Sequence, residues 1–142
     1  MMSVESSILE YIKSLPEGIA KDIEYLHRHI IQHFPAKKLW FLDGKNEQGK
    51  VVSNPNIGYG ICQLSKGKQK EFYQVGISAT SKGISVYLMG VSDKSLLKQQ
   101  FGSRLPHAQM SGYCVKIKHL KEMDWSAFNE LLAFGFSLEF RS

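Results

Sequence analysis

The first third of the chain repeats its apolar residues at helical spacing. Ser3 is placed to cap a first helix, and Pro16 is placed at the first position of a second helix. That helix ends near His33, because the residue before Pro35 avoids helical geometry. The apolar stripe of the first helix consists of Val4, Ile8, Tyr11 or Ile12, and Leu15. The stripe of the second consists of Ile19, Ile23, Leu26 and Ile30. These patterns predict an N-terminal αα-hairpin.

From residue 38 onward, apolar and polar positions alternate, as they do in strands that bury one face. Gly58 and Gly60 share one face of such a strand with Cys62, and small residues let another element approach the backbone closely. The stretch SKGKQK at residues 65–70 is typical of a hairpin turn. The predicted strands cover residues 38–42, 57–64, 72–78, 84–89 and 113–118.

The second half of the chain contains two further helical patterns. Ser92 can cap a helix that reaches about Phe101, and a loop with glycine and proline follows at residues 102–112. Asp124 can cap the last helix. The buried stripe of that helix is predicted to be Trp125, Phe128, Leu131 and Leu132.

Helices at both ends and strands between them define the expected fold class. This order predicts an α+β protein, and hairpin-length connections require antiparallel pairing. We expect an N-terminal αα-hairpin, an antiparallel sheet of about five strands and a C-terminal helix. The 142 residues suffice for one ordinary domain with its own core, so residues 1–142 are expected to form a single domain.

The composition is that of a globular protein, with 43% hydrophobic and 22% charged residues. No window approaches the roughly 18 apolar residues of a membrane span. The N-terminus carries Glu5 and Glu10 and lacks a basic start, unlike a secretory signal. Only two cysteines occur, Cys62 and Cys114, and free thiols are the simpler interpretation. We therefore expect a cytoplasmic protein that does not engage a membrane.

The formal net charge of +5 comes mainly from lysine, since Arg28, Arg104 and Arg141 are the only arginines. Sites that read nucleic-acid bases favour arginine for its bidentate fork, whereas a modest excess of scattered lysines is typical of a solubility device. Weak, lysine-driven association with nucleic acid is therefore an alternative function and not the leading one.

Aromatic residues on neighbouring predicted strands provide the best argument for a binding site. Glycines at positions 58, 60 and 76 have no side chains and so leave space on the sheet beside these rings. Aromatic walls with phenolic hydroxyl groups suit a small, partly apolar ligand. The alternative is that these rings fill the space between sheet and helices, since strand aromatics are normal core material. The candidate cavity walls are Trp40, Tyr59, Tyr73 and Tyr87.

Two histidines offer a candidate metal site. His29 and His33 lie four residues apart on the second predicted helix, and Asp22 lies on the same edge of that helix. Three such side chains could hold iron or zinc with one position open. The alternative is a solvated helix flank, and a pI of 9.2 opposes iron buffering, which would require an acidic surface.

Cys114 is the candidate nucleophile. It shares a strand face with Lys116 and Lys118, whose ammonium groups favour the thiolate, and His107 or His119 could act as its base. The alternative is a packing role, because free cysteine is among the most often buried residues. The chain contains no P-loop, nucleophile elbow or dinucleotide fingerprint. We therefore expect binding of a small ligand or a partner protein on the sheet, and not catalysis.

Several stretches resemble the YdhG-like family. They are IGYG at residues 57–60, VGISATSKGISVYLMG at 75–90 and GYCVKIKHLKEMDWSAFNELLAFG at 112–135. The opening ILEYIKSLPEGIAKDIEYLHRHI also looks like the start of that family. The resemblance implies a curved antiparallel sheet flanked by N- and C-terminal helices. It leaves the function open, because the family is a domain of unknown function, and it implies frataxin-like iron handling as an alternative.

Overall fold

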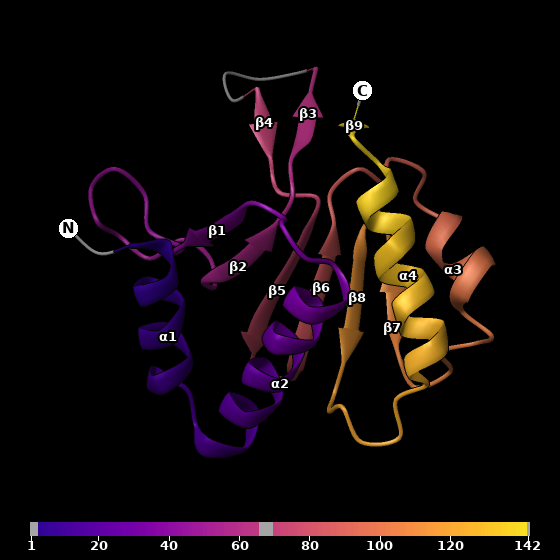
Figure 1. The fold of residues 1–142 in the computed structure, drawn as a ribbon, viewed down its shortest axis with the longest axis horizontal. Helices are drawn as coiled ribbons and strands as arrows, with labels where there is room; N and C mark the ends of the chain where they lie inside the picture. The colour runs from indigo at the N-terminus through magenta and orange to yellow at the C-terminus, as the bar shows by residue number, and fades with distance from the viewer. Residues whose placement is uncertain (1–2, 66–69, 142) are drawn as a thin grey trace.

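The computed structural model describes residues 3–65 and 70–141. The helices are α1 (Val4–Ser14), α2 (Glu17–His33), α3 (Leu96–Phe101) and α4 (Trp125–Ser137) (Figure 1). The strands are β1 (Leu39–Leu42), β2 (Asn56–Tyr59), β3 (Cys62–Leu64), β4 (Glu71–Phe72), β5 (Val75–Thr80), β6 (Gly83–Leu88), β7 (Gln109–Ser111), β8 (Cys114–Ile117) and β9 (Phe140–Arg141).

The N-terminal αα-hairpin is confirmed. The Ser3 side chain caps α1 by accepting a hydrogen bond from the backbone N–H of Ser6. Pro16 is the N-cap residue of α2 and not its first helical residue, and α2 ends at His33, before Pro35. At the other end of the chain, Asp124 caps α4 as predicted, because its carboxylate accepts from the N–H of Ala127.

The main sheet has six strands in the order β1-β2-β5-β6-β8-β7, and every neighbouring pair is antiparallel. The α+β class is therefore confirmed, with one strand more than expected. The additional strand is β7, which lies within the predicted loop 102–112. Three residues that are exposed or half-buried give too short an alternation to predict a strand.

A second, three-stranded sheet in the order β4-β3-β9 extends beyond the first (Figure 1). It arises because the predicted strand 57–64 is interrupted at Gly60, whose φ of 81° lies in the left-handed region. The prediction of one continuous strand there was wrong, as it was for residues 72–78, where Tyr73 and Gln74 separate β4 from β5. The predicted turn at 65–70 lies largely outside the described residues.

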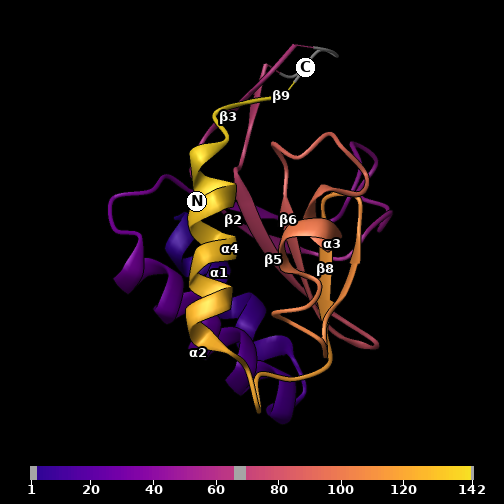
Figure 2. The same ribbon diagram turned by 90° about the vertical axis from the view of Figure 1, so that its right-hand side faces the viewer.

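Helices α1, α2 and α4 lie on one side of the main sheet (Figure 2), and α3 packs beside α4 through Phe101 and Phe134. The prediction that Ser92 caps α3 was wrong, because this helix begins at Leu96 without a side-chain cap. The helices contribute Ile8, Ile12, Ile23, Leu26, Ile30, Phe128, Leu131 and Leu132 to the core. The sheet contributes Ile57, Tyr59, Val75, Ile77, Ile84, Val86, Leu88, Val115 and Ile117.

We call the opposite side of the main sheet the helix-free face, since no helix of the described part of the chain covers it. Strand residues that alternate with the core positions point to this face. On β8, for example, Val115 and Ile117 are buried in the core, whereas Lys116 between them is exposed. In residues 3–65 and 70–141, no helix combines the length and the apolar character needed to cross a membrane.

Candidate functional site

The strand register separates one predicted cavity residue from the others. Trp40 pairs with Gly58, Gly58 with Gly76, and Gly76 with Tyr87, so these positions form one row on the helix-free face. Tyr59 follows Gly58 and therefore points the other way, into the core beneath the helices. The predicted aromatic residues consequently do not line one common cavity.

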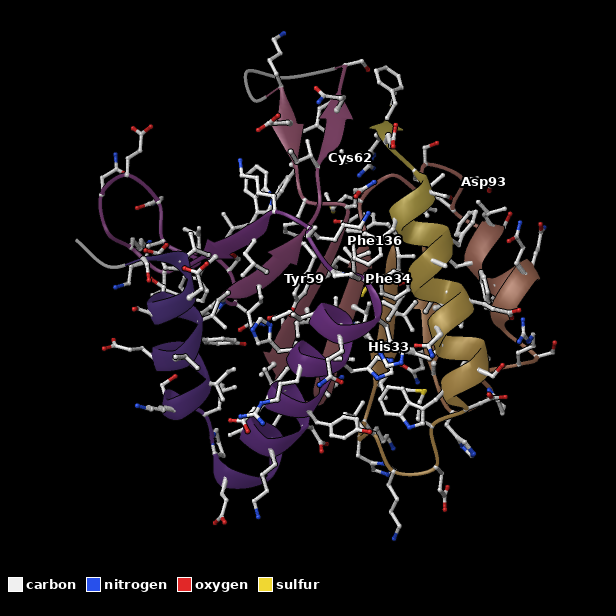
Figure 3. The ribbon with its side chains drawn as sticks, in the orientation of Figure 1. His33, Phe34, Tyr59, Cys62, Asp93 and Phe136 are labelled. Atoms are coloured by element: carbon white, nitrogen blue, oxygen red, sulfur yellow. The ribbon has the colours of Figure 1, made fainter. Side chains whose placement is uncertain are left out.

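Tyr59 is enclosed, with 1% of its surface exposed (Figure 3). Its hydroxyl and His27 Nδ1 are hydrogen-bonded at 2.7 Å, which joins β2 to α2. Burial raises the pKa of Tyr59 well above its ordinary value. Burial also lowers the pKa of His27, with a smaller contribution in the same direction from the Arg28 charge. The hydroxyl of Tyr59 is thus occupied within the protein and is not available to a ligand.

Tyr73 occupies the space that the glycines leave on the helix-free face. A Cβ atom at Gly58 would lie 2.4 Å from Tyr73 Cδ2, and one at Gly76 would lie 2.4 Å from Tyr73 Cε1. The hydroxyl of Tyr73 donates to Asn56 Oδ1 at 3.0 Å. Burial raises the pKa of Tyr73. The space above the two glycines is therefore filled by a side chain of the protein itself, since only 3% of Tyr73 is exposed.

Other rings continue this arrangement in both directions and form what we call the aromatic row. Ring centroids are 6.0 Å apart for Trp40 and Phe72, 4.4 Å for Phe72 and Tyr73, and 6.1 Å for Tyr87 and Tyr113. Trp40 and Tyr87 are partly exposed, and Tyr113 is 37% exposed. The aromatic row consists of Trp40, Phe72, Tyr73, Tyr87 and Tyr113.

Both ends of the aromatic row carry a cation. Lys38 Nζ lies 4.3 Å from the centre of the Trp40 ring, and the Arg141 guanidinium lies 5.2 Å from the centre of the Tyr113 ring. The indole N–H of Trp40 donates to the carbonyl oxygen of Gly60 at 2.8 Å, which fixes the ring against the chain where β2 ends. Lys38 is also paired with Glu71, so the cation at the Trp40 end is balanced by a carboxylate, whereas Arg141 forms no such ion pair within the described residues.

Cys114 lies opposite Tyr87 in the register, on the same face. Its pKa is raised, because burial outweighs the hydrogen bond from Ser85 and the charge of Lys116, which both lower it. Lys116 thus acts in the expected direction, towards the thiolate, but burial has the larger effect on the pKa of Cys114. No hydrogen bond joins the thiol to a histidine anywhere in the described segments, so the structure assembles no cysteine–histidine pair.

The proposed bases, His107 and His119, line a separate hollow of about 270 Å³. The hollow lies between the loop that precedes β7 and the loop that joins β8 to α4, and its polar lining carries both signs of charge. Arg104 on its rim forms an ion pair with Glu130, and Asp124 is occupied as the cap of α4. Two of the charged residues in its lining therefore already have partners within the protein.

The predicted metal ligands are not brought together as a set of three in the described part of the chain. The rings of His29 and His33 stack with centroids 4.0 Å apart, but His29 Nε2 is hydrogen-bonded to Asn129 Oδ1 at 2.6 Å. His33 Nδ1 donates to the carbonyl oxygen of His29 at 2.9 Å. Among the residues that the structure describes, no group of three or more His, Cys, Asp or Glu side chains could hold a metal ion. Asp22 therefore does not complete a ligand set with the histidines.

No family model, no curated protein and no solved structure was found to match this chain. The resemblance to the YdhG-like family stays a prediction, as does the iron handling that it implies. The functional argument therefore rests on the geometry of the helix-free face.

Proposed function

We propose that this protein is a binding domain that takes a small ligand with an aromatic or flat apolar part on its helix-free face. The observation that carries the proposal is the aromatic row, in which the buried Tyr73 lies over Gly58 and Gly76, the strand partners of the partly exposed Trp40 and Tyr87. A flat ligand that lies on these rings would gain stacking contacts and would displace water from apolar surface.

A small ligand is favoured over a partner protein by the size of the accessible surface. Four residues of the row are at least partly exposed, namely Trp40, Phe72, Tyr87 and Tyr113. A standard protein–protein interface uses about 20–30 residues on each side, many more than the row provides. Binding is also favoured over covalent chemistry at this place, since burial raises the pKa of the Cys114 thiol and so disfavours the reactive thiolate.

The chain offers a spectroscopic test, because its tryptophans lie in different places. Trp40 belongs to the helix-free face, whereas Trp125 packs against His29 near α2. In a Trp125→Phe variant the indole fluorescence comes from Trp40 alone, and a library of aromatic small molecules should contain compounds that change it saturably. The matched Trp40→Phe variant, which reports from Trp125, should not respond to those compounds.

A second variant separates binding from stability. Tyr87→Leu removes a partly exposed ring and leaves the buried Tyr73 in place. We expect it to weaken binding about tenfold, since one lost aromatic contact of about 1.4 kcal/mol corresponds to that factor. A library without a hit in the Trp125→Phe protein, or hits that Tyr87→Leu leaves unchanged, would refute the proposal.

A further inference from the structure

We propose that the helix-free face also carries a phosphate-binding subsite beside the aromatic row. The subsite is a hollow of about 330 Å³, which we call the basic hollow, and it falls at the lower end of the size range of small-molecule pockets. Its lining comes from the β5–β6 turn, from β8 and from the chain that enters β7. The lining residues are Lys82, His107, Gln109, Lys116, Ile117 and Lys118.

The charge of the basic hollow is unbalanced. Three lysines, Lys82, Lys116 and Lys118, line it, and no carboxylate belongs to its lining. Within residues 3–65 and 70–141, none of these lysines forms an ion pair, whereas Lys38 and Arg104 each have a glutamate partner. Like charges held close together repel one another, and a bound anion removes that repulsion. The mixed-charge hollow around His119 offers no such imbalance.

The backbone brings the lysines together at a tight turn. Thr80 pairs with Gly83 at the end of the β5–β6 hairpin, which places Lys82 in the turn. Gly83 has a φ of 129°, and a Cβ atom there would lie 2.4 Å from the carbonyl oxygen of Ile117 and 2.8 Å from Lys118 Cα. Glycine therefore allows the turn to lie directly against β8, which brings Lys82 to the same hollow as Lys118.

The chemistry of these groups selects phosphate. Lysine binds phosphate as a mobile point charge, and several lysines together with other hydrogen-bond donors can surround its oxygens from different sides. The side-chain amide of Gln109 and the imidazole of His107 supply such donors in the lining of the hollow. A hollow of about 330 Å³ fits a phosphorylated small molecule rather than a single ion.

The position of the basic hollow links it to the aromatic row. Cys114, which pairs with Tyr87, precedes Lys116 by two residues on β8, a rise of about 6.8 Å at 3.4 Å per residue. One ligand could therefore rest a ring on the row and place a phosphate among the lysines. This extension to a phosphorylated aromatic compound rests on the proposed function, whereas the phosphate subsite itself does not.

The test uses pyrophosphate, adenosine and adenosine monophosphate as probes, titrated calorimetrically into the full chain at low salt. Pyrophosphate carries no ring and reports on the basic hollow, whereas adenosine carries no phosphate and reports on the row. We expect the double variant Lys116→Gln/Lys118→Gln to bind pyrophosphate at least tenfold more weakly, as expected for the loss of two charged contacts. The control Lys13→Gln/Lys50→Gln lowers the net charge equally at distant exposed positions and should bind like the original protein.

The outcomes separate the two proposals. Pyrophosphate binding without adenosine binding supports the subsite and contradicts the stacking role of the row, and adenosine binding without pyrophosphate binding does the reverse. Equal losses in the control variant would show general charge attraction and would overturn the subsite. Binding of a single-stranded RNA oligomer in the absence of any response to pyrophosphate or adenosine monophosphate would also overturn it, in favour of a polymer.

Discussion

The two faces of the main sheet reach the same degree of burial by different means. On β5, Ile77 and Ser78 are neighbours in sequence, both 0% exposed, and they point to opposite faces. Ile77 is covered by helices, whereas the face of Ser78 is covered by a neighbouring loop and by side chains that fold over the sheet. Burial in this domain therefore does not require a second layer of secondary structure.

The same contrast holds for two buried tyrosines. Tyr59 is enclosed beneath α2, and its hydroxyl meets His27. Tyr73 is enclosed because it lies across Gly58 and Gly76, and its hydroxyl meets Asn56. The Tyr59 ring is packed between the sheet and the helices, whereas the Tyr73 ring lies in the space that two glycines leave on the sheet. The second arrangement leaves adjacent rings accessible, which is why the helix-free face is the candidate binding surface.

The sharpest test of this comparison is a pair of substitutions on β5. Ile77→Ala should reduce the free energy of unfolding by about 2–5 kcal/mol, because it leaves a cavity beneath the helices. Ser78→Ala should cost about 1 kcal/mol, because it removes the hydrogen bond from the hydroxyl to the carbonyl oxygen of Pro55. Urea denaturation measures both. Equal losses would show that the faces are packed in the same way.

The glycines beneath Tyr73 provide the next largest effect. Gly76→Ala should cost about 1–3 kcal/mol, because its Cβ would overlap the Tyr73 ring and force it to move. In a Tyr73→Ala background the same substitution should cost much less, and a double-mutant cycle measures the difference. Gly18→Ala is the control, since a Cβ there meets no atom within 4 Å. A purely additive cycle would contradict the contact.

The His27–Tyr59 contact predicts a smaller, pH-dependent effect. The pKa of His27 in the folded protein lies below its ordinary value of 6.5. Between these two pKa values, the unfolded chain therefore binds more protons than the folded one. The contribution of His27 to the free energy of unfolding is therefore fully present above pH 6.5. It is lost as the pH decreases towards the folded-state pKa. His27→Gln should reduce this slope, and Tyr59→Phe should cost about 1 kcal/mol at neutral pH. A slope unchanged in His27→Gln would exclude His27 as its source.

The smallest effect concerns the thiol on the helix-free face. Because burial raises the pKa of Cys114, its alkylation at neutral pH should be slower than that of an unfolded cysteine peptide. Ser85→Ala should slow the reaction further, because the Ser85 hydrogen bond lowers this pKa. Mass spectrometry of the Cys62→Ala protein follows Cys114 alone. Alkylation faster than that of the peptide would restore the nucleophile hypothesis.

Local signals in the sequence predicted the helices and the antiparallel class well. Apolar spacing and the caps Ser3 and Asp124 depend on neighbours within a few residues, so α1, α2 and α4 could be placed without knowledge of the rest. The fold class followed from the order of elements and from the short connections between the strands. These predictions succeeded because helix caps and tight hairpins are decided locally.

The candidate site was predicted less well, because it depends on pairing between distant strands. Alternation alone put Tyr59 on the face opposite to Gly58, but only the register shows which face the helices cover. The left-handed turn at Gly60 and the placement of Tyr73 over two other strands have no local signature. The basic hollow was missed for the same reason, since Lys82 and Lys118 belong to different hairpins.

The small sheet has a consequence for how the domain opens. Strand β9 joins β3 in a parallel ladder of two residue pairs, and most of the second half of the chain lies between those partners. Closing so long a segment costs chain entropy, and so short a ladder returns few contacts. We expect this ladder to form late and to separate first, by a local opening that leaves the six antiparallel strands intact. Each such opening would release Arg141 from Tyr113, and so uncover one end of the aromatic row from time to time.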